Sequence, residues 1–479
     1  MSKNDPCVKA VTFAQKGDTN QALTAVARCK KILQKNIKKY SNTPEMMFGL
    51  KKQLVKAIRL EAQLQISKNV ITKAVNLYNQ GLSILDRLTE DTEVLFLKAH
   101  VNYSLGLIEF LKNNLDQAVV KYTISKDYFT KISYYEQVVE ILFRLIDIQS
   151  QRGNLNNAWQ LSKEIGSKSK KIKNKEKKKK VKAKLYIIQA RILFKQDKVN
   201  EGEKTLSKAK KEYNKLDDAE GMIDVLLEQV HLSPDLDNHK KEDLLLQALE
   251  HANLYDLKLY QGLIETELGI ILLKTGNFEK GKKRLLRGLK LRTETGDKMG
   301  TAQSLLELAR ISLITSQNED DLKNTLTFSN QAYELYSELE HSYGSAQALE
   351  LMGTVNTKLN NIDTAHRELI KSRKIFRRFK DSNAEARILT QIGLLLDLKN
   401  EVADSILVLD KAETLYTKTN NSQGIAEVLQ LKANLIDDKA EALKLFKRSR
   451  EIYSVIIGDR EDLRPILFTL DVKIKELSD

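Results

Sequence analysis

Four ten-residue strings in the second half of the chain share one pattern of apolar and polar positions. Each begins and ends with Gly or Ala and carries apolar residues at helical spacing between: GTAQSLLELA at 300–309, GSAQALELMG at 344–353, AEARILTQIG at 384–393 and GIAEVLQLKA at 424–433. Their closing residues stand 44, 40 and 40 positions apart. Apolar residues recurring at a fixed long period predict an array of repeated structural units, each burying its apolar face against the next.

A second periodic feature lies between these strings. It is an apolar residue followed by an aromatic one: Leu335-Tyr336, Ile375-Phe376, Leu415-Tyr416 and Ile452-Tyr453. One unit is therefore two helices joined by a turn. The chain has only four prolines in 479 residues, and because proline breaks helix interiors, the sequence predicts an all-α fold with short connections.

The repeat register is set by a small residue that closes the first helix of each unit. A second small residue tends to follow 12 positions later and a third 7 after that, while a large apolar residue stands 16 positions after the closing one, as Leu369 does after Gly353. We expect Gly353 and Gly393 to be helix crossings with no room for a side chain. The closing positions are Gly106, Ile146, Ala190, Val230, Gly269, Ala309, Gly353, Gly393 and Ala433.

Small residues at intervals of 12 and 7 resemble the tetratricopeptide repeat (TPR), which carries them at its eighth, twentieth and twenty-seventh positions. The period of about 40 residues is similar to the long-repeat branch that includes kinesin light chain, rapsyn and the Leu-Gly-Asn repeat adaptor. Ile146 and Val230 depart from the pattern because they are large where the family has small residues. The resemblance implies a right-handed superhelical solenoid of helix-turn-helix hairpins that binds proteins.

The chain divides into five predicted segments. These are a degenerate helical hairpin at 1–40, TPR-like repeats at 46–166, a lysine-rich segment at 167–184, the main TPR array at 185–455 and a capping helix at 456–479. A cap is expected because an open array end would leave an apolar face in water.

The resemblance also implies where a partner binds, since the first helix of each TPR hairpin faces the concave groove. Extended peptides and partner helices suit such a groove. We expect Arg310 and Arg387 to meet an acidic or carboxylate-bearing partner segment through charge-assisted bonds. The predicted groove residues are Gln303, Arg310, Gln347, Glu350, Thr354, Arg387, Thr390, Glu427, Gln430 and Asn434.

Basic residues are unevenly placed. From Lys168 to Lys184 there are eleven lysines against the single acid Glu176, so this run contributes +10 of the net +15. Three interpretations stay open: a nuclear-import or nucleic-acid patch, a surface for acidic proteins, anionic lipid or tubulin-like tails, and a solvated helix end or insertion. The run's centre is Lys177, Lys178, Lys179 and Lys180. Further basic clusters at 369–380 and 445–450 are expected late in second helices, where they complement the helix dipole.

No catalytic constellation, metal site or cofactor site emerges. The six histidines form no pair at helical ligand spacing, and there is no glycine-rich phosphate loop. The two cysteines, Cys7 and Cys29, lie 22 positions apart, which predicts neither a disulfide scaffold nor a thiolate metal site and favours a reducing compartment.

The start of the chain is polar, and no run of eighteen apolar residues occurs. We therefore expect no transmembrane segment and a cytoplasmic location. A cytoskeletal, ciliary or nuclear location stays open. The sequence and the resemblance together predict a non-catalytic adaptor or scaffold that holds a segment of one protein partner in its concave groove, as a subunit of a multi-subunit complex. The alternative is a protein that docks RNA or DNA through the lysine-rich segment.

Overall fold

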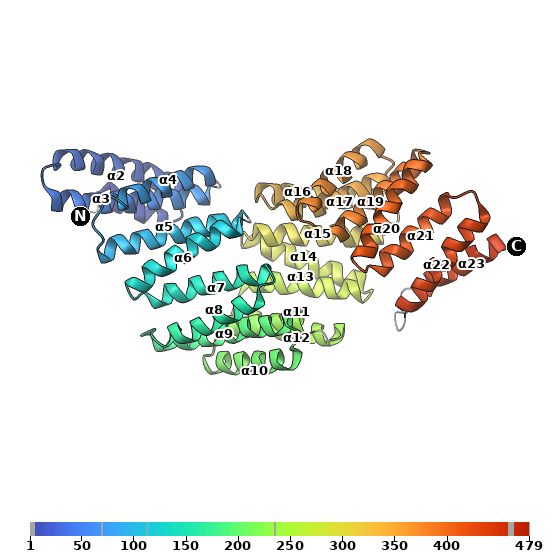
Figure 1. Cartoon of the computed structure of the whole chain (residues 1–479), viewed down its shortest axis with the longest axis horizontal. Coiled ribbons are helices and arrows are strands. Elements are labelled where there is room, and N and C mark those ends of the chain that lie inside the picture. The colour runs from blue at the N-terminus through green and yellow to red at the C-terminus, as the bar shows by residue number, and fades with distance from the viewer. Residues whose placement is uncertain (1–4, 69, 113, 234–235, 458–463, 479) are drawn as a thin grey trace. The chain divides into compact units, whose positions relative to one another are not determined.

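The computed structural model describes residues 5–68, 70–112, 114–233, 236–457 and 464–478. Within these ranges every regular element is a helix, numbered α1 to α23 (Figure 1). The predicted all-α class is confirmed.

The chain forms two compact units, Met1–Pro234 and Asp235–Asp479. The helices of the first unit are α1 (Pro6–Gln15), α2 (Thr19–Lys39), α3 (Pro44–Ser67), α4 (Ile71–Leu85), α5 (Thr92–Leu111), α6 (Leu115–Lys131), α7 (Tyr135–Gln151), α8 (Leu155–Ser169), α9 (Lys175–Lys195), α10 (Val199–Lys215) and α11 (Ala219–Leu232).

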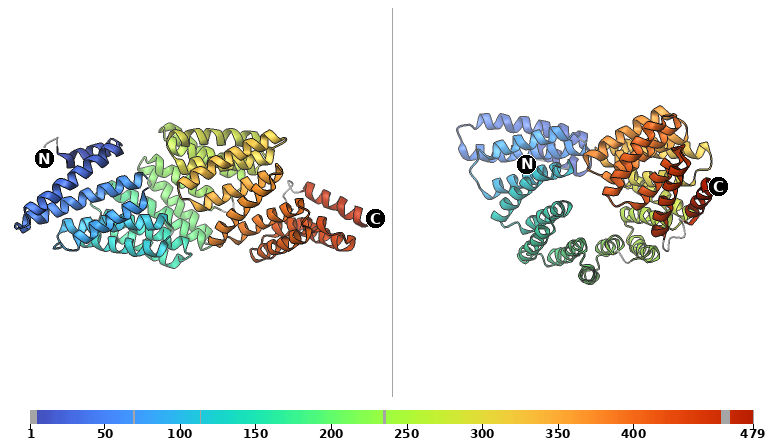
Figure 2. Two further views of the ribbon diagram at one scale, coloured as in Figure 1. Left: turned by 90° about the horizontal axis from the view of Figure 1, so that it is seen from above. Right: turned by 45° about the vertical axis from the view of Figure 1, so that its right-hand side comes forward.

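The second unit continues the same alternation of first and second helices. It contains α12 (Asn238–Leu254), α13 (Lys258–Lys274), α14 (Phe278–Glu294), α15 (Lys298–Thr315), α16 (Glu319–Glu338), α17 (Ser342–Lys358), α18 (Ile362–Arg378), α19 (Ser382–Leu398), α20 (Val402–Lys418), α21 (Ser422–Leu435), α22 (Lys439–Ile457) and α23 (Arg464–Ser478). Figure 2 shows the helices of this unit, in yellow to red, packed side by side as successive hairpins.

The two helices of a hairpin cross at the predicted closing residue. A Cβ atom placed on Gly353 would lie 2.7 Å from Cγ of Leu369, and one on Gly393 would lie 2.7 Å from Cδ2 of Leu409. Real Cβ atoms are not found this close to another carbon. The same relation holds for Gly106 with Tyr122, at 2.9 Å. The predicted small-to-large interval of 16 residues is thus the contact between the two helices of one hairpin.

A second close approach joins each hairpin to the next. The ring of Tyr336, near the end of α16, lies over Gly344 at the start of α17, and Tyr416 lies over Gly424 in the same way, each within 2.6 Å of where a Cβ would stand. The aromatic pairs and the opening glycines of the sequence pattern are therefore the two halves of one contact. Its residues are eight positions apart.

The turns between hairpins use residues with positive φ. Lys380 and Asn420 have φ of 55° and 52°, a left-handed conformation that ends a helix and lets the chain reverse. The next helix is then capped: the side chain of Asp381 accepts a hydrogen bond from the Ala384 N–H at 2.9 Å.

The N-terminal hairpin corrects one sequence-based expectation. Cys7 on α1 and Cys29 on α2 form a disulfide, with their Cα atoms 4.9 Å apart. The prediction of no disulfide was wrong because the two helices run antiparallel, which brings residues 22 positions apart side by side.

The C-terminal helix α23 packs on α22, and Leu470 is 2% exposed. Of the predicted capping segment 456–479, residues 458–463 and 479 lie outside the described residues. The segment boundaries given by the sequence stay predictions.

Among the described residues, α5 alone has the length and composition to cross a membrane, and half of it is buried inside the protein.

Candidate functional site

The first helices of the second unit form a continuous wall. Helices α13, α15, α17, α19 and α21 each contact the next of their kind directly, across the intervening second helix. In a curved stack the elements on the inside crowd together, so this row forms the concave side of the unit.

The predicted groove residues lie along this wall and on four of its helices, α15, α17, α19 and α21. Glu350 and Thr390 are buried, and Glu427 and Asn434 are exposed. The partly exposed ones are Gln303, Arg310, Gln347, Thr354, Arg387 and Gln430. Polar side chains thus follow one another on an otherwise apolar set of helices.

Arg387 on α19 is held by Glu350 on α17. The guanidinium donates from Nε to Oε1 at 2.5 Å and from Nη2 to Oε2 at 2.9 Å. The hydrogen bond from Glu350 raises the pKa of Arg387, so this side chain stays charged. The bidentate geometry is the strong form of an Arg–carboxylate contact. Arg387 is therefore neutralised by its own chain.

Arg310 also has a carboxylate from its own helix. Its Nε lies 3.5 Å from Oε1 of Glu307, one turn earlier on α15. Burial raises the pKa of Glu307, and Arg310 opposes that rise. An acidic partner approaching either arginine would have to compete with a carboxylate that is already in place.

Glu427 on α21 has a different environment. Glu427 is exposed to solvent, but the protein atoms around its carboxyl group partly desolvate it and so raise its pKa. No hydrogen bond or ion pair to it occurs among the described residues. Burial, together with the nearby Glu427 carboxylate, raises the pKa of the Tyr416 and Tyr453 phenols. Among the described residues, the groove thus presents a carboxylate with no cation beside it.

Arg292 on the second helix α14 is a buried charged residue that the sequence pattern did not show. It is 1% exposed and stands against Gly300, at the position that other hairpins give to an aromatic ring. Its Nη1 donates to Oε1 of Gln303 at 3.2 Å and lies 3.9 Å from Oδ2 of Asp297. The sequence spacing could have shown that Arg292 takes the place of the aromatic ring, because Arg292 precedes Gly300 by the same eight positions as Tyr336 precedes Gly344.

The comparison with solved structures supports the fold of helical hairpins. The chain aligns with a signal transduction ATPase with numerous domains (STAND) that has a tetratricopeptide repeat sensor, from Pyrococcus horikoshii, at a TM-score of 0.51 and 16% identity. The chain has a TPR-like fold. The match covers 76% of this chain and 55% of the ATPase chain, so this TPR-like array spans about half the length of that protein.

Two further structures are similar to smaller parts of the TPR-like array. BtubC (BKLC) from P. vanneervenii matches with a TM-score of 0.39 and 14% identity over 47% of this chain and 94% of its own. The TPR-like repeats of a putative kinesin light chain from Podosopora anserina match with a TM-score of 0.33 and 13% identity over 40% of this chain and 95% of their own. No family model and no curated protein matches the sequence.

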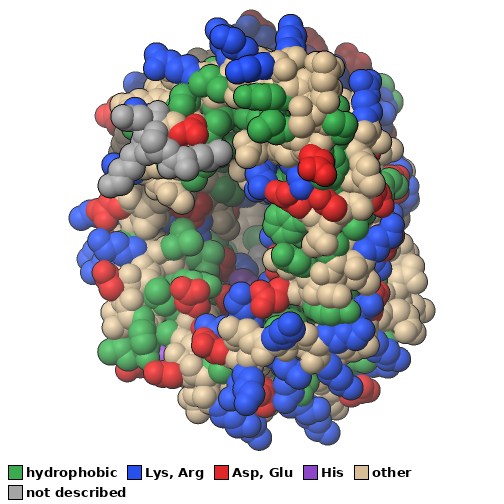
Figure 3. All heavy atoms as spheres, turned by 90° about the vertical axis from the view of Figure 1, so that its left-hand side faces the viewer, with side chains coloured by type: hydrophobic (Ala, Val, Ile, Leu, Met, Phe, Trp, Pro, Cys, Tyr) green, Lys and Arg blue, Asp and Glu red, His purple; other side chains and the backbone are tan. Residues whose placement is uncertain are grey.

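The lysine-rich segment of the TPR-like array covers the end of α8 and the first half of α9. Lys177 Nζ lies 2.7 Å from Glu136, and Lys180 Nζ lies 3.0 Å from Asp218. Lys178 donates to a backbone carbonyl at Lys170. Of the four predicted patch residues, Lys179 alone lacks such a contact among the described residues. Figure 3 shows Lys and Arg side chains gathered along the lower edge, at the level where Figure 1 draws α9 and α10.

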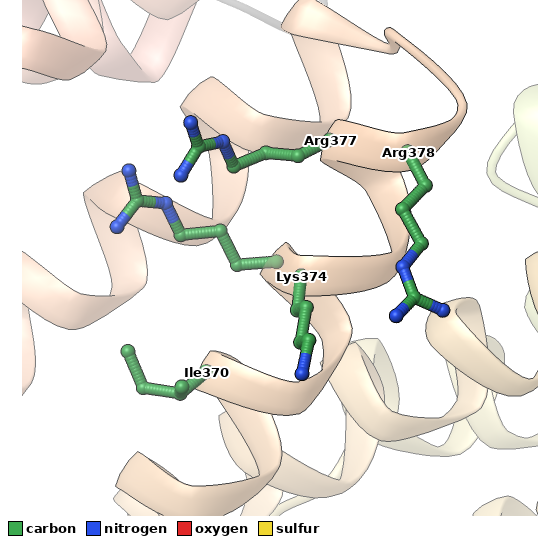
Figure 4. A pocket seen from close by; sticks show the side chains of 5 residues that line it. Ile370, Lys374, Arg377 and Arg378 are labelled. Atoms are coloured by element: carbon green, nitrogen blue, oxygen red, sulfur yellow. The ribbon is translucent and has the colours of Figure 1, made fainter.

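A second basic surface lies on α18, within the predicted cluster 369–380. Its pocket is lined by Ile370, Arg373, Lys374, Arg377 and Arg378. Arg373 Nη2 and Arg377 Nε lie 2.9 and 3.5 Å from the same carboxylate, that of Glu385. Figure 4 shows Arg377 and Arg378 pointing away from each other. The position late in a second helix agrees with the sequence-based expectation, since Arg377 and Arg378 form the last turn.

Within the described residues no group of three His, Cys, Asp or Glu side chains is placed to hold a metal ion. The site on the concave wall is a row of hydrogen-bonding groups on a rigid helical scaffold.

Proposed function

We propose that this protein is a non-catalytic adaptor that holds a segment of a partner protein against the concave wall of its second unit, as a subunit of a larger assembly. The observation that supports the proposal is the row of polar side chains on the concave wall. Gln347 on α17 and Glu427 and Asn434 on α21 lie along it, and among the described residues none of these side chains has a hydrogen-bond or ion-pair partner.

The charge pattern indicates which groups of the partner are recognised. Arg387 and Arg310 have carboxylates of their own chain at 2.5 and 3.5 Å, whereas Glu427 has no cation beside it among the described residues. A partner segment with a Lys or Arg side chain would supply that missing charge in a partly desolvated place, where charge-assisted hydrogen bonds are strongest. Amides such as Gln347 can bind the backbone of the same segment.

A location in the cytoplasm is part of the proposal, but the disulfide between Cys7 and Cys29 removes the support that the cysteine count gave to a reducing compartment. We propose no nucleic-acid function for the lysine-rich segment, because three of its four central lysines are engaged within the chain.

The test is a quantitative affinity purification of the tagged full chain from cells that express it. The groove variant carries Glu427→Lys and Asn434→Lys, and the matched control carries Ala at Lys177, Lys178, Lys179 and Lys180. We expect the groove variant to lose the main partner and the control to keep it, with helix content unchanged in both.

Loss of the partner in the lysine control, with retention in the groove variant, would overturn the proposal. If that binding also weakened steeply with added salt, it would indicate a nucleic acid, since phosphate contacts release counterions.

A further inference from the structure

The first unit contains a pocket of about 750 Å³ between its N-terminal hairpins. Its walls come from α1, α2, α3 and α5, and most of its lining is apolar. Val8 and Val11 on α1, Leu60 on α3 and Phe96 on α5 are among the lining residues. This volume lies within the range of small-molecule sites, which are usually apolar with a few placed polar groups.

The pocket exists because α1 is short. It has 10 residues, against 21 in α2 and 24 in α3, so it covers only part of the face that α3 presents. Val11, on the pocket side, is left 47% exposed. The disulfide between Cys7 and Cys29, both lining residues, fixes α1 to α2 and so holds this wall in place.

One cation without a counter-ion lines this apolar space. Arg59 on α3 makes no hydrogen bond or ion pair to another described residue, and its Nη1 is buried without a partner. Lys56, the other basic lining residue, is paired with Glu93 at 2.5 Å. The pocket therefore offers a single uncompensated positive charge.

His100 on α5, which lies near Arg59, does not add a second positive charge at neutral pH. Burial, together with Arg59, lowers the pKa of His100 to about 4. A ligand with one negative charge matches this balance, whereas a dianion would keep one charge unpaired in a partly desolvated place.

We propose that this pocket binds a small amphiphilic monocarboxylate. The carboxylate pairs with the guanidinium of Arg59, whose planar fork suits two parallel hydrogen bonds. The apolar body of the ligand lies against Val8, Val11, Leu60 and Phe96 and removes their surface from water. None of the pocket residues belongs to the concave wall of the second unit, so this proposal does not depend on the proposed adaptor function.

The test is isothermal titration of the full-length protein with three probes that share one chain: octanoate, 1-octanol and octylammonium. Saturable binding with one site is expected for octanoate, weaker binding for 1-octanol and weakest for octylammonium. Arg59→Gln should weaken octanoate binding by about tenfold or more and leave 1-octanol unchanged. Arg87→Gln, an exposed arginine on the same unit, is the control and should bind octanoate like the wild type.

A second variant keeps the test decisive if Arg59→Gln loses helix content. Val11→Trp fills the pocket from the exposed side of α1 and should abolish binding of both octanoate and 1-octanol. Equal octanoate affinity in the wild type and Arg59→Gln, binding of octylammonium as tight as that of octanoate, or the absence of saturable binding to the wild type would each overturn the proposal.

Discussion

The guanidinium of Arg387 on α19 is held by the carboxylate of Glu350 on α17 through two hydrogen bonds, at 2.5 and 2.9 Å. The two residues are 37 positions apart and belong to successive hairpins. The pair therefore ties neighbouring repeats together on the concave wall, and it sets how much positive charge the groove offers to a partner.

This pair gives the first prediction. Glu350→Gln and Arg387→Gln should each destabilise the array, and the double variant should be less destabilised than the sum. The expected coupling is about 1 kcal/mol, because Glu350 is nearly buried while Arg387 is partly exposed to water. Urea unfolding of the four proteins measures it. Strict additivity would mean that the pair contributes nothing to the stability of the wall.

The second prediction concerns the crossing at Gly353. Gly353→Leu should lower the free energy of unfolding by about 1–3 kcal/mol, because the new side chain would overlap Leu369. Gly49→Leu is the control, since a Cβ at Gly49 meets nothing within 4 Å. Thermal melts compare the two, and equal melting temperatures would show that the repeat register is misplaced.

The third prediction is a pH dependence in the first unit. The pKa of His100 is near 4 in the folded chain because of burial and Arg59, while that of an unfolded histidine is about 6.5. The unfolded chain thus binds the proton more readily, and the stabilisation is complete above pH 6.5 and is lost as the pH falls toward 4.

His100→Phe removes this titration and keeps a ring against Phe96 and Phe129, whose centroids lie 4.4 and 5.0 Å from that of His100. Melting temperatures measured at pH 7 and pH 5 should therefore fall more in the wild type than in the variant. A parallel fall in both proteins would contradict the assignment of the effect to His100.

The fourth prediction concerns the disulfide. Its loop of 22 residues corresponds to about 3 kcal/mol of stabilisation in the chain-entropy model. Replacing Cys7 and Cys29 with Ser should raise the rate of amide hydrogen exchange in α1, because α1 has few other neighbours. Helices α13 to α21 should exchange as before. Unchanged protection of α1 would show that its packing on α2 and α3 suffices.

The sequence predicted the fold well because the determinants of the hairpins are local and periodic. Gly353 and Leu369 are 16 positions apart, and the spacing alone indicated their contact. The disulfide was missed because the count of two cysteines was weighed without asking which residues the first hairpin brings together.

The ion pair between Arg387 and Glu350 was missed for another reason. It joins residues nearly one period apart, and no motif marks it in a single string. Arg191 and Glu228 on α9 and α11 repeat the arrangement at the same separation of 37, with Nε to Oε2 at 2.8 Å. Opposite charges at that interval are a signal that could have shown that Arg387 has a partner within the chain.

The most direct test of the adaptor proposal is site-specific photo-crosslinking of the full-length protein in cells that express it. A photoreactive phenylalanine derivative replaces Gln347 or Asn434 on the concave wall, and in separate proteins Lys411 on the second helix α20 or Lys179 in the lysine-rich segment. We predict that Gln347 and Asn434 give an adduct with the same protein, and that Lys411 and Lys179 do not. An adduct formed at Lys179 or Lys411 and absent from both groove positions would contradict the account.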